Sequence, residues 1–395
     1  MADKLKILYI DPWCANGSNL FYYSTGLVGA LSKKADVTLV CAKDCSFFCE
    51  ELRSIERLFF RLSNRMKKGP IRTIIRGVEY VAAYRKINKL AIKRKFDLIH
   101  IEWPLFYRFD SKMFKRLKKH CSVFSIKAHN VIPHSSGKKY IEVFNKIYQT
   151  ADVILVHGLK MKEKLCKLFP NSASKVSIQH HGVYSNFENE FDLSKIDPKI
   201  VNLLEKYKRI YLFFGRIDND KGVDRIVSAW GDFATKKESM LIIAGMPASG
   251  YDFDSLKNQL AFYENVFVYD KFVSDNFMNF LFTKCNIVLL PYIDGSMSGV
   301  VFTASQFSKP ILSTDFGVVS EYLVNDENSF VTNNDYLSFY KKLVYIDDYV
   351  SNEKLAKMGL DLTKHINTFF SWDNIASKLV EETYRAAIID CEKSR

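Results

Sequence analysis

The chain has 395 residues, of which 48% are hydrophobic and 26% are charged, and its formal net charge is +13. This length and composition are typical of a globular protein with two domains that each bury a core, not of a disordered or fibrous chain. No apolar run approaches the ~18–20 residues of a bilayer-spanning helix, and no signal-peptide pattern precedes the first strand, so we expect a cytoplasmic protein.

Strand and helix patterns alternate through the first half of the chain, which is typical of βαβ units and a parallel sheet. A strand at Leu5–Ile10 is followed by a polar loop, Asp11–Ser18, and by a helix at Asn19–Ser32. Further strands are expected at Val37–Cys41, Leu98–Ile101, Val123–Ile126, Val153–Val156 and Val176–Gln179, with a helix at Lys160–Phe169. The pattern predicts a Rossmann-like domain over residues 1–190.

Eight cysteines occur, and Cys41, Cys45 and Cys49 repeat at four-residue spacing. No Cys-x-x-Cys pair has a second half at zinc spacing, and no His or carboxylate partner occurs near these three at ligand spacing. We therefore expect no metal site and interpret the cysteines as free thiols in a reducing compartment.

The interval Arg53–Lys95 is the most basic part of the chain, with arginines at four-residue spacing from Arg53 to Arg65 and apolar residues between the cations. Two basic amphipathic helices separated at Gly69-Pro70 would lie on an anionic membrane face, where each cation contributes on the order of 1 kcal/mol. A solvated basic face whose apolar side packs on the core explains the same pattern. Nucleic acid is not expected as a partner, because no recognition fold accompanies the charge.

The polar interval Glu188–Lys208 lacks a strand pattern and is interpreted as a connection with one short helix, Lys199–Lys206. The alternation then resumes and predicts a second Rossmann-like domain over residues 209–371. Its strands are expected at Tyr211–Phe214, Met240–Ala244, Val266–Val268, Ile287–Leu290, Ile311–Ser313 and Phe330–Val331.

Two loops of this second half have the features of a phosphate site. Gly215 ends a strand, Arg216 and Lys221 lie in the loop, and Gly222 leads into a helix. A helix start presents N–H groups and partial positive charge to an anion, and the two cations add full charges. A plain strand–loop–helix connection with solvated cations is the simpler alternative.

The second loop, Ile293–Gly299, follows the strand pattern Asn286–Tyr292 and precedes a helix-like segment, Val300–Ser308. The small residues Ser298-Gly299 at that helix start let backbone amides approach a diphosphate closely. Two such loops at the carboxyl ends of strands in one sheet face the crevice in which open α/β sheets bind ligands.

The order and spacing of several motifs resemble family 4 glycosyltransferases. The donor half is matched by Gly215-Arg216, Lys221-Gly222, Ser298-Gly299, Lys309-Pro310 and Glu321, and the acceptor half by His129-Asn130, Ala151-Asp152 and His181-Gly182-Val183-Tyr184. The resemblance covers most of the chain and implies the GT-B fold, in which two Rossmann-like α/β/α domains face each other across a cleft. It also implies that the helix in residues 372–395 returns to the first domain.

The resemblance implies a retaining transferase that moves a hexose from a UDP- or GDP-sugar to a saccharide acceptor, lipid-linked at the inner face of the cytoplasmic membrane. No metal and no cofactor beyond the nucleotide-diphosphate sugar are implied. The catalytic residues would be His129, beside the transferred sugar, and Arg216 and Lys221, which neutralise the departing diphosphate. The resemblance assigns donor binding to Gly215, Arg216, Lys221, Ser296, Ser298, Gly299, Val300, Thr303 and Glu321. It assigns acceptor binding to Asp11, Asn16, Gly17, Ser18 and His181, and generic turn chemistry explains the four loop residues about as well.

The second loop departs from the family pattern, in which many members carry two Glu residues. An ungapped count back from Lys309-Pro310 places Gly295 and Thr303 at those positions. The Ser-Gly-Val form of this loop is similar to a subgroup of bacterial exopolysaccharide transferases, with Thr303 expected to bind ribose and Asp294 or Ser296 to reach the sugar. Two other functions stay open: a nucleotide-sugar epimerase or hydrolase on the same fold, and a catalytically silent GT-B subunit that binds a partner.

Overall fold

The computed structural model describes residues 4–16, 18, 20–132, 137–183, 190–233, 238–295 and 297–393. The chain divides into two compact units, one made of Met1–Tyr184 with Phe370–Arg395 and the other of Ser185–Phe369. Each unit is built on one parallel sheet in the described part of the chain. The predicted pair of α/β domains with parallel sheets is therefore confirmed.

The first unit carries a seven-stranded sheet in the order β3-β2-β1-β4-β5-β6-β7. Its strands are β1 (Lys6–Ile10), β2 (Asp36–Ala42), β3 (Ser54–Phe59), β4 (Phe96–Ile101), β5 (Cys121–Lys127), β6 (Val153–Val156) and β7 (Val176–Ile178). The central strands are buried on both faces, which is why they appear in the sequence as continuous apolar runs. Strand order reverses between the neighbours β1 and β4.

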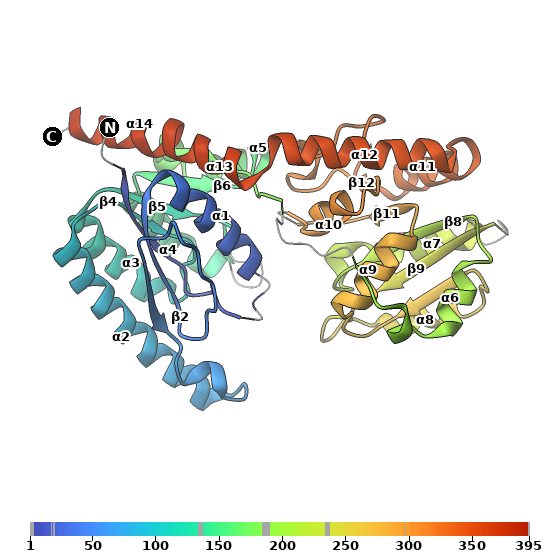
Figure 1. The fold of residues 1–395 in the computed structure, drawn as a ribbon, viewed down its shortest axis with the longest axis horizontal. Helices are drawn as coiled ribbons and strands as arrows, with labels where there is room; N and C mark the ends of the chain where they lie inside the picture. The colour runs from blue at the N-terminus through green and yellow to red at the C-terminus, as the bar shows by residue number, and fades with distance from the viewer. Residues whose placement is uncertain are drawn as a thin grey trace. The chain divides into compact units, whose positions relative to one another are not determined.

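Helices cover both faces of this sheet (Figure 1). One face carries α1 (Phe21–Lys34), α13 (Trp372–Lys378) and α14 (Arg385–Lys393), and the other carries α2 (Pro70–Arg94), α3 (Tyr107–Leu117) and α4 (Gly137–Thr150), while α5 (Leu159–Leu168) connects β6 and β7. Glycine at 26 lets α1 and α13 approach closely, because a Cβ there would lie 2.2 Å from Trp372 Nε1. None of the helices in the described part of the chain has the length and apolar composition of a membrane span.

The prediction of two basic helices within Arg53–Lys95 is wrong for the first part of that interval. Ser54–Phe59 forms the edge strand β3, which pairs in parallel with β2, and α2 is the one α-helix of the interval, preceded by a 3-10 turn at Ser63–Arg65. A four-residue spacing cannot separate the two structures, because four is also a multiple of the two-residue repeat of a strand. The Arg57 side chain donates to the backbone carbonyls of Cys45 and Phe47, so it belongs to the fold and not to a solvated basic face.

The second unit carries a six-stranded sheet in the order β10-β9-β8-β11-β12-β13. Its strands are β8 (Arg209–Phe214), β9 (Ser239–Ala244), β10 (Val266–Tyr269), β11 (Ile287–Leu290), β12 (Ile311–Thr314) and β13 (Phe330–Thr332). Its helices are α6 (Pro198–Leu204), α7 (Val223–Phe233), α8 (Phe253–Leu260), α9 (Asp275–Lys284), α10 (Val300–Gln306), α11 (Tyr336–Tyr349) and α12 (Asn352–Phe369). All the strands predicted for this half are present, and strand order reverses between β8 and β11.

Candidate active site

The loops after β8 and β11 meet at the carboxyl edge of the second unit's sheet. These two strands are neighbours at the point where strand order reverses, which is where open α/β sheets bind ligands. The backbone N–H groups of Ile293 and Asp294 donate to the Asp220 carbonyl over 2.9 and 3.3 Å, so the loops are joined directly. Gly222 has a φ of +63°, and a Cβ there would lie 2.1 Å from the Pro291 carbonyl oxygen. Glycine at 222 is therefore required for the loops to approach each other.

Lys221 and Arg216 both lie in the loop after β8, in different environments. The Lys221 ammonium lies 4.1 Å from the centre of the Tyr292 ring and 3.1 Å from Asp220 Oδ2, and only 17% of its side chain is exposed. The Arg216 guanidinium lies 2.6 Å from Asp218 Oδ2 and is 61% exposed. Lys221 is thus held against the loop after β11, whereas Arg216 can exchange its carboxylate partner for a phosphate.

Ser298 joins the same cluster through Tyr292. Its hydroxyl lies 3.2 Å from the Tyr292 hydroxyl, and the Tyr292 ring in turn contacts the Lys221 ammonium. Gly215, at the end of β8, faces the start of α10, since a Cβ there would lie 3.8 Å from Val300 Cγ2. The structure therefore brings the predicted phosphate residues of both loops to one place, with Gly299 capping α10.

The remaining predicted donor residues lie around this cluster or outside the described part of the chain. Thr303 is buried, and its hydroxyl donates to the Gly299 carbonyl at 3.4 Å. Glu321 is half-buried and ends the short turn Val319–Glu321, which follows β12. Ser296, like Gly17 of the predicted acceptor set, lies outside the described residues. The ribose and sugar contacts assigned to Thr303, Ser296 and Glu321 stay predictions.

The carboxyl edge of the first unit's sheet carries a cluster of buried polar side chains that follow successive strands. They are Asp11 after β1, Glu102 after β4, His129 after β5, His157 after β6 and His181 after β7. His181 donates from Nδ1 to the Gly182 carbonyl at 2.7 Å, and burial lowers its pKa to about 3. The structure thus collects three predicted residues, Asp11, His129 and His181, with two that were not predicted.

Glu102 lies at the centre of this cluster. Its carboxylate accepts hydrogen bonds from the Tyr9 hydroxyl, from His100 Nε2 at 2.9 Å and from His129 Nε2 at 2.5 Å. Burial would raise the pKa of Glu102, but its electrostatic and hydrogen-bond interactions with His129 and His100 outweigh burial and hold the pKa well below its ordinary value of 4.5. Glu102 is therefore an ionised carboxylate with three donors in a water-excluded site.

His129 uses both ring nitrogens within the protein. Nε2–H donates to Glu102, and Nδ1 accepts from His157 Nε2 at 3.0 Å. The Trp103 ring stacks on the imidazole with 3.9 Å between ring centres and 6° between planes. Burial lowers the pKa of His129 despite the neighbouring carboxylate, so the ring is neutral. The predicted hydrogen bond from His129 to a sugar would require one of these protein partners to be replaced.

The loop after β1 is held by hydrogen bonds of its own predicted residues. Asp11 accepts from the Ser24 hydroxyl, and burial raises its pKa to about 7. Asn16 Oδ1 accepts from the Ser46 backbone N–H at 2.9 Å and from its hydroxyl at 2.7 Å. Ser18 and Asn16 line a cavity of about 710 Å³ that opens beside this loop. Asp11 thus shapes the loop, whereas Asn16 and Ser18 border open space.

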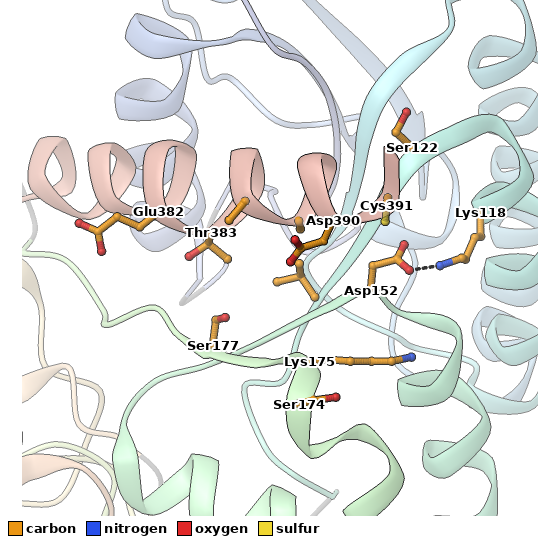
Figure 2. Close-up of a pocket in the computed structure, with 13 residues that line it drawn as sticks. Lys118, Ser122, Asp152, Ser174, Lys175, Ser177, Glu382, Thr383, Asp390 and Cys391 are labelled. Atoms are coloured by element: carbon orange, nitrogen blue, oxygen red, sulfur yellow. Dashed lines mark hydrogen bonds and ion pairs between the residues drawn. The ribbon is translucent and has the colours of Figure 1, made fainter. Parts of the chain in front are cut away.

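A second cavity, of about 510 Å³, lies at the opposite edge of the same sheet. Figure 2 shows Asp390 and Cys391 of the C-terminal helical segment close to Asp152, and Glu382 and Lys175 line the same cavity; Asp152 and Lys175 directly precede β6 and β7. Ligands of parallel sheets bind at the carboxyl ends of strands, not at the amino ends. We therefore do not assign the active site to this cavity.

Sequence reasoning missed Glu102, Trp103 and His157, although one signal for them exists. Each follows the end of a buried strand by one or two residues. Residues at that position of different parallel strands share one sheet edge, so polar and aromatic side chains there are candidates for a common site. The motifs that carry the family resemblance include His129 but not these three residues.

Comparison with known proteins relates the second unit to a family of transferases. Residues 195–358 match the family Glycosyl transferases group 1. An uncharacterized glycosyltransferase of Methanocaldococcus jannaschii is 24% identical over 251 residues, which are 61% of this chain and 61% of the relative. A 2-deoxystreptamine N-acetyl-D-glucosaminyltransferase of Niallia circulans is 24% identical over 257 residues, 60% of this chain and 64% of the relative. The chain thus matches about three fifths of the length of these curated relatives.

Solved structures resemble the chain over nearly its full length. Sucrose-phosphate synthase from Thermosynechococcus elongatus has a TM-score of 0.70 at 14% identity, covering 98% of this chain and 100% of that one. The Anabaena protein HepE, in complex with UDP and glucose, has a TM-score of 0.66 at 14% identity, covering 96% and 99%. At this identity the likeness shows the fold, and that fold is the predicted GT-B arrangement of two Rossmann-like α/β domains.

Proposed function

We propose that this protein is a retaining family 4 glycosyltransferase that moves a hexose from a UDP- or GDP-sugar to a saccharide acceptor in glycan or surface-polysaccharide synthesis. One observation carries the proposal: the Arg216–Lys221 loop and the Tyr292–Ser298 loop meet where strand order reverses between β8 and β11. The match of this region to group 1 glycosyl transferases and the fold shared with HepE, which is named in complex with UDP, support it.

The donor loops offer the charge that a departing nucleoside diphosphate requires. Lys221 is positioned by the Tyr292 ring and by Asp220, so its ammonium needs little reorganisation when charge develops on the leaving oxygen. The guanidinium of Arg216 is exposed and can form two hydrogen bonds to a second phosphate. We propose that these two groups act without a metal ion, and that the departing diphosphate takes the proton of the acceptor hydroxyl during front-face attack.

The first unit is proposed to hold the saccharide acceptor. Asn16 and Ser18 line the cavity beside the loop after β1, and Asp11 and His181 are buried at the same edge of the sheet. His129 follows β5 at the same edge of the sheet and donates a hydrogen bond to Glu102. We propose that the neutral imidazole shapes the acceptor side of the site and contacts the sugar after exchanging its His157 partner.

A panel of UDP-, GDP- and ADP-sugars tests the proposal on the wild-type chain. The cognate donor at 100 times its dissociation constant should stabilise the protein by about 2.7 kcal/mol, measured by thermal shift. Release of nucleoside diphosphate should then require an added saccharide acceptor. Free diphosphate or an epimerised sugar without acceptor would favour a hydrolase or epimerase, and no shift with any nucleotide sugar would favour a silent binding subunit.

We also propose that the protein binds an anionic membrane face, where a lipid-linked acceptor would be found. The start of α2 exposes three apolar side chains on one helix face, with 68%, 69% and 65% exposure for Ile71, Ile74 and Val78. Leu62 adds a fourth at 57% exposure, and the neighbouring Arg65 is an exposed cation. Apolar side chains rimmed by cations are the combination that interfacial helices use.

Flotation with vesicles that contain an anionic phospholipid tests this surface. The double variant Ile71→Glu/Ile74→Glu should lose flotation, because carboxylates would have to enter the headgroup region of an anionic membrane. Phe262→Glu is the matched control, since that residue is 87% exposed in the second unit. Unchanged flotation of the double variant, or equal loss in the control, would contradict membrane binding through α2. Arg57 is avoided because its side chain holds the Cys45 loop.

A further inference from the structure

The cavity beside the loop after β1 is lined by aromatic and cationic side chains to which the proposed sugar transfer assigns no role. It belongs wholly to the first unit and has a volume of about 710 Å³. Trp13 and Trp103 line it together with the cations Lys68, Arg72 and Arg76. We propose that this cavity binds the acceptor, and that the acceptor is a saccharide carrying a phosphate group. The inference rests on the proposed glycosyl transfer and adds the chemical class of its acceptor.

Two of the three cations, Arg72 and Arg76, are held in place by hydrogen bonds. Arg72 Nε donates to the Ser63 carbonyl at 2.9 Å, and Arg76 Nη1 donates to Asn64 Oδ1 at 3.0 Å. Both are hydrogen bonds to neutral oxygens, and no ion pair of Arg72, Arg76 or Lys68 occurs among the residues that the structure describes. The Arg72 and Arg76 side chains are therefore oriented before any anion arrives, which lowers the entropic cost of binding one.

The carboxylate in the cavity wall does not cancel this charge. Asp44 lines the cavity, but its oxygens accept from the Asn64 amide at 3.1 Å. Burial, followed by the neighbouring Arg72 guanidinium, lowers the pKa of Arg76 from its ordinary 12.5, and the carboxylates of Glu79 and Asp44 offset this only in part. Three cations facing one carboxylate suit a phosphate, with up to two charges and three acceptor oxygens, better than a singly charged carboxylate.

The two tryptophans give the same cavity surfaces for a saccharide ring. Trp13 is 36% exposed, and the Arg76 guanidinium lies 5.1 Å from the centre of its ring, so the phosphate and ring positions adjoin. Trp103 Nε1–H is buried and has no acceptor in the described part of the chain. This N–H is not accessible from the cavity, so Trp103 offers a saccharide the surface of its ring and not a hydrogen bond.

The cavity lies beside residues that were predicted to bind the acceptor. Asn16 and Ser18, which were predicted to bind the acceptor, line it as well. The Trp103 ring stacks on His129 with 3.9 Å between ring centres, so the cavity is one aromatic ring away from the predicted catalytic histidine. A phosphate held by Arg72 and Arg76 would therefore anchor the acceptor beside His129.

Titration of the tryptophan fluorescence of the full chain tests this inference with glucose 6-phosphate, glucuronic acid and glucose as probes. Glucose 6-phosphate should quench saturably and bind at least about tenfold more tightly than either other probe, a difference of about 1.4 kcal/mol. Arg72→Gln/Arg76→Gln should lose at least about tenfold in affinity. Arg85→Gln/Lys89→Gln, exposed residues of the same helix with the same change of charge, should keep the wild-type value. Lys68→Gln, at an exposed position, should weaken binding in the same direction without touching the helix core.

A competition experiment with a lipid-diphosphate-linked saccharide in detergent micelles distinguishes a lipid-linked acceptor from a soluble sugar phosphate. Displacement of glucose 6-phosphate by the loaded micelles, but not by empty ones, assigns the site to a lipid-linked acceptor, and displacement by neither assigns it to a soluble sugar phosphate. Equal binding of all three probes would overturn the inference. So would loss of glucose 6-phosphate binding in Arg216→Ala/Lys221→Ala but not in Arg72→Gln/Arg76→Gln.

Measuring donor-nucleotide binding tests the proposed function separately from phosphate binding in the cavity. The Arg72→Gln/Arg76→Gln variant should retain the thermal shift with the donor nucleotide, because its substitutions lie in the first unit and the donor loops in the second. A wild-type chain that binds glucose 6-phosphate but no nucleotide sugar would refute the donor proposal alone.

Discussion

Lys221→Ala is expected to lower kcat/KM for sugar transfer by about 100- to 1,000-fold, the loss that follows removal of one preorganised charge-stabilising group. The Lys221 ammonium is 17% exposed and is positioned by Asp220 and the Tyr292 ring, so water cannot easily replace it. Its charge matters most when the diphosphate leaves, and the loss should appear chiefly in kcat. Single-turnover transfer with saturating donor measures this directly.

Arg216→Ala should act in the same direction with a smaller loss, about tenfold or more, because the side chain is 61% exposed and solvent weakens its charge. Lys284→Ala is the matched control, since Lys284 is an exposed lysine at the end of α9 in the same unit. Its rate should equal that of wild type. Transfer rates within a few-fold of wild type in both Lys221→Ala and Arg216→Ala would show that the diphosphate site lies elsewhere.

Glu102→Ala is expected to lower the free energy of unfolding of the first unit by about 3 kcal/mol or more, because each of three buried donors that loses its acceptor costs about 1–3 kcal/mol. The substitution leaves the Tyr9 hydroxyl and one N–H each of His100 and His129 without their acceptor in a site that water does not reach. Chemical denaturation followed by tryptophan fluorescence measures the loss, because Trp103 stacks on His129. Glu163→Ala, at an exposed position of α5, should change stability by no more than about 0.5 kcal/mol.

The difference in unfolding free energy between wild type and Glu102→Ala should also depend on pH. The folded-state pKa of Glu102 lies below its ordinary value of 4.5, so the unfolded chain takes up the proton first as pH falls. The stabilisation that Glu102 supplies is fully present above pH 4.5 and is lost as pH falls from there through the lower folded-state pKa. The gap between wild type and Glu102→Ala should therefore narrow on acidification, and a gap that stays constant would show that the carboxylate is not ionised in the fold.

The strands of the second unit were predictable because their residues are buried on both faces of a parallel sheet. Such strands appear as short apolar runs bounded by glycine or polar residues, as Tyr211–Phe214 and Ile287–Leu290 do. The edge strand Ser54–Phe59 was missed for the opposite reason. Five of its six side chains are half-buried and two of them are charged, so the arginine spacing fitted a helix equally well.

The donor loops were also predictable, since the backbone there demands particular residues. Gly222 must adopt a positive φ beside Pro291, and the small Ser298-Gly299 pair begins α10. These requirements are local and leave a trace in the sequence. The acceptor side was predictable only in part, because Glu102, Trp103 and His157 become neighbours of His129 through strand order and not through sequence distance.

The sequence by itself determined that the chain forms two parallel α/β domains, and it predicted that the loops after β8 and β11 hold an anion. Apolar periodicity and the glycine positions encode both, since burial and backbone conformation act residue by residue. Only the tertiary structure decided that Glu102 holds His129 by a hydrogen bond, and that Arg72 and Arg76 face a cavity with Trp13 while Ile71 and Ile74 are exposed to solvent. Those pairings depend on which strands lie side by side and on how one helix is rotated against the sheet, and no local pattern carries that information.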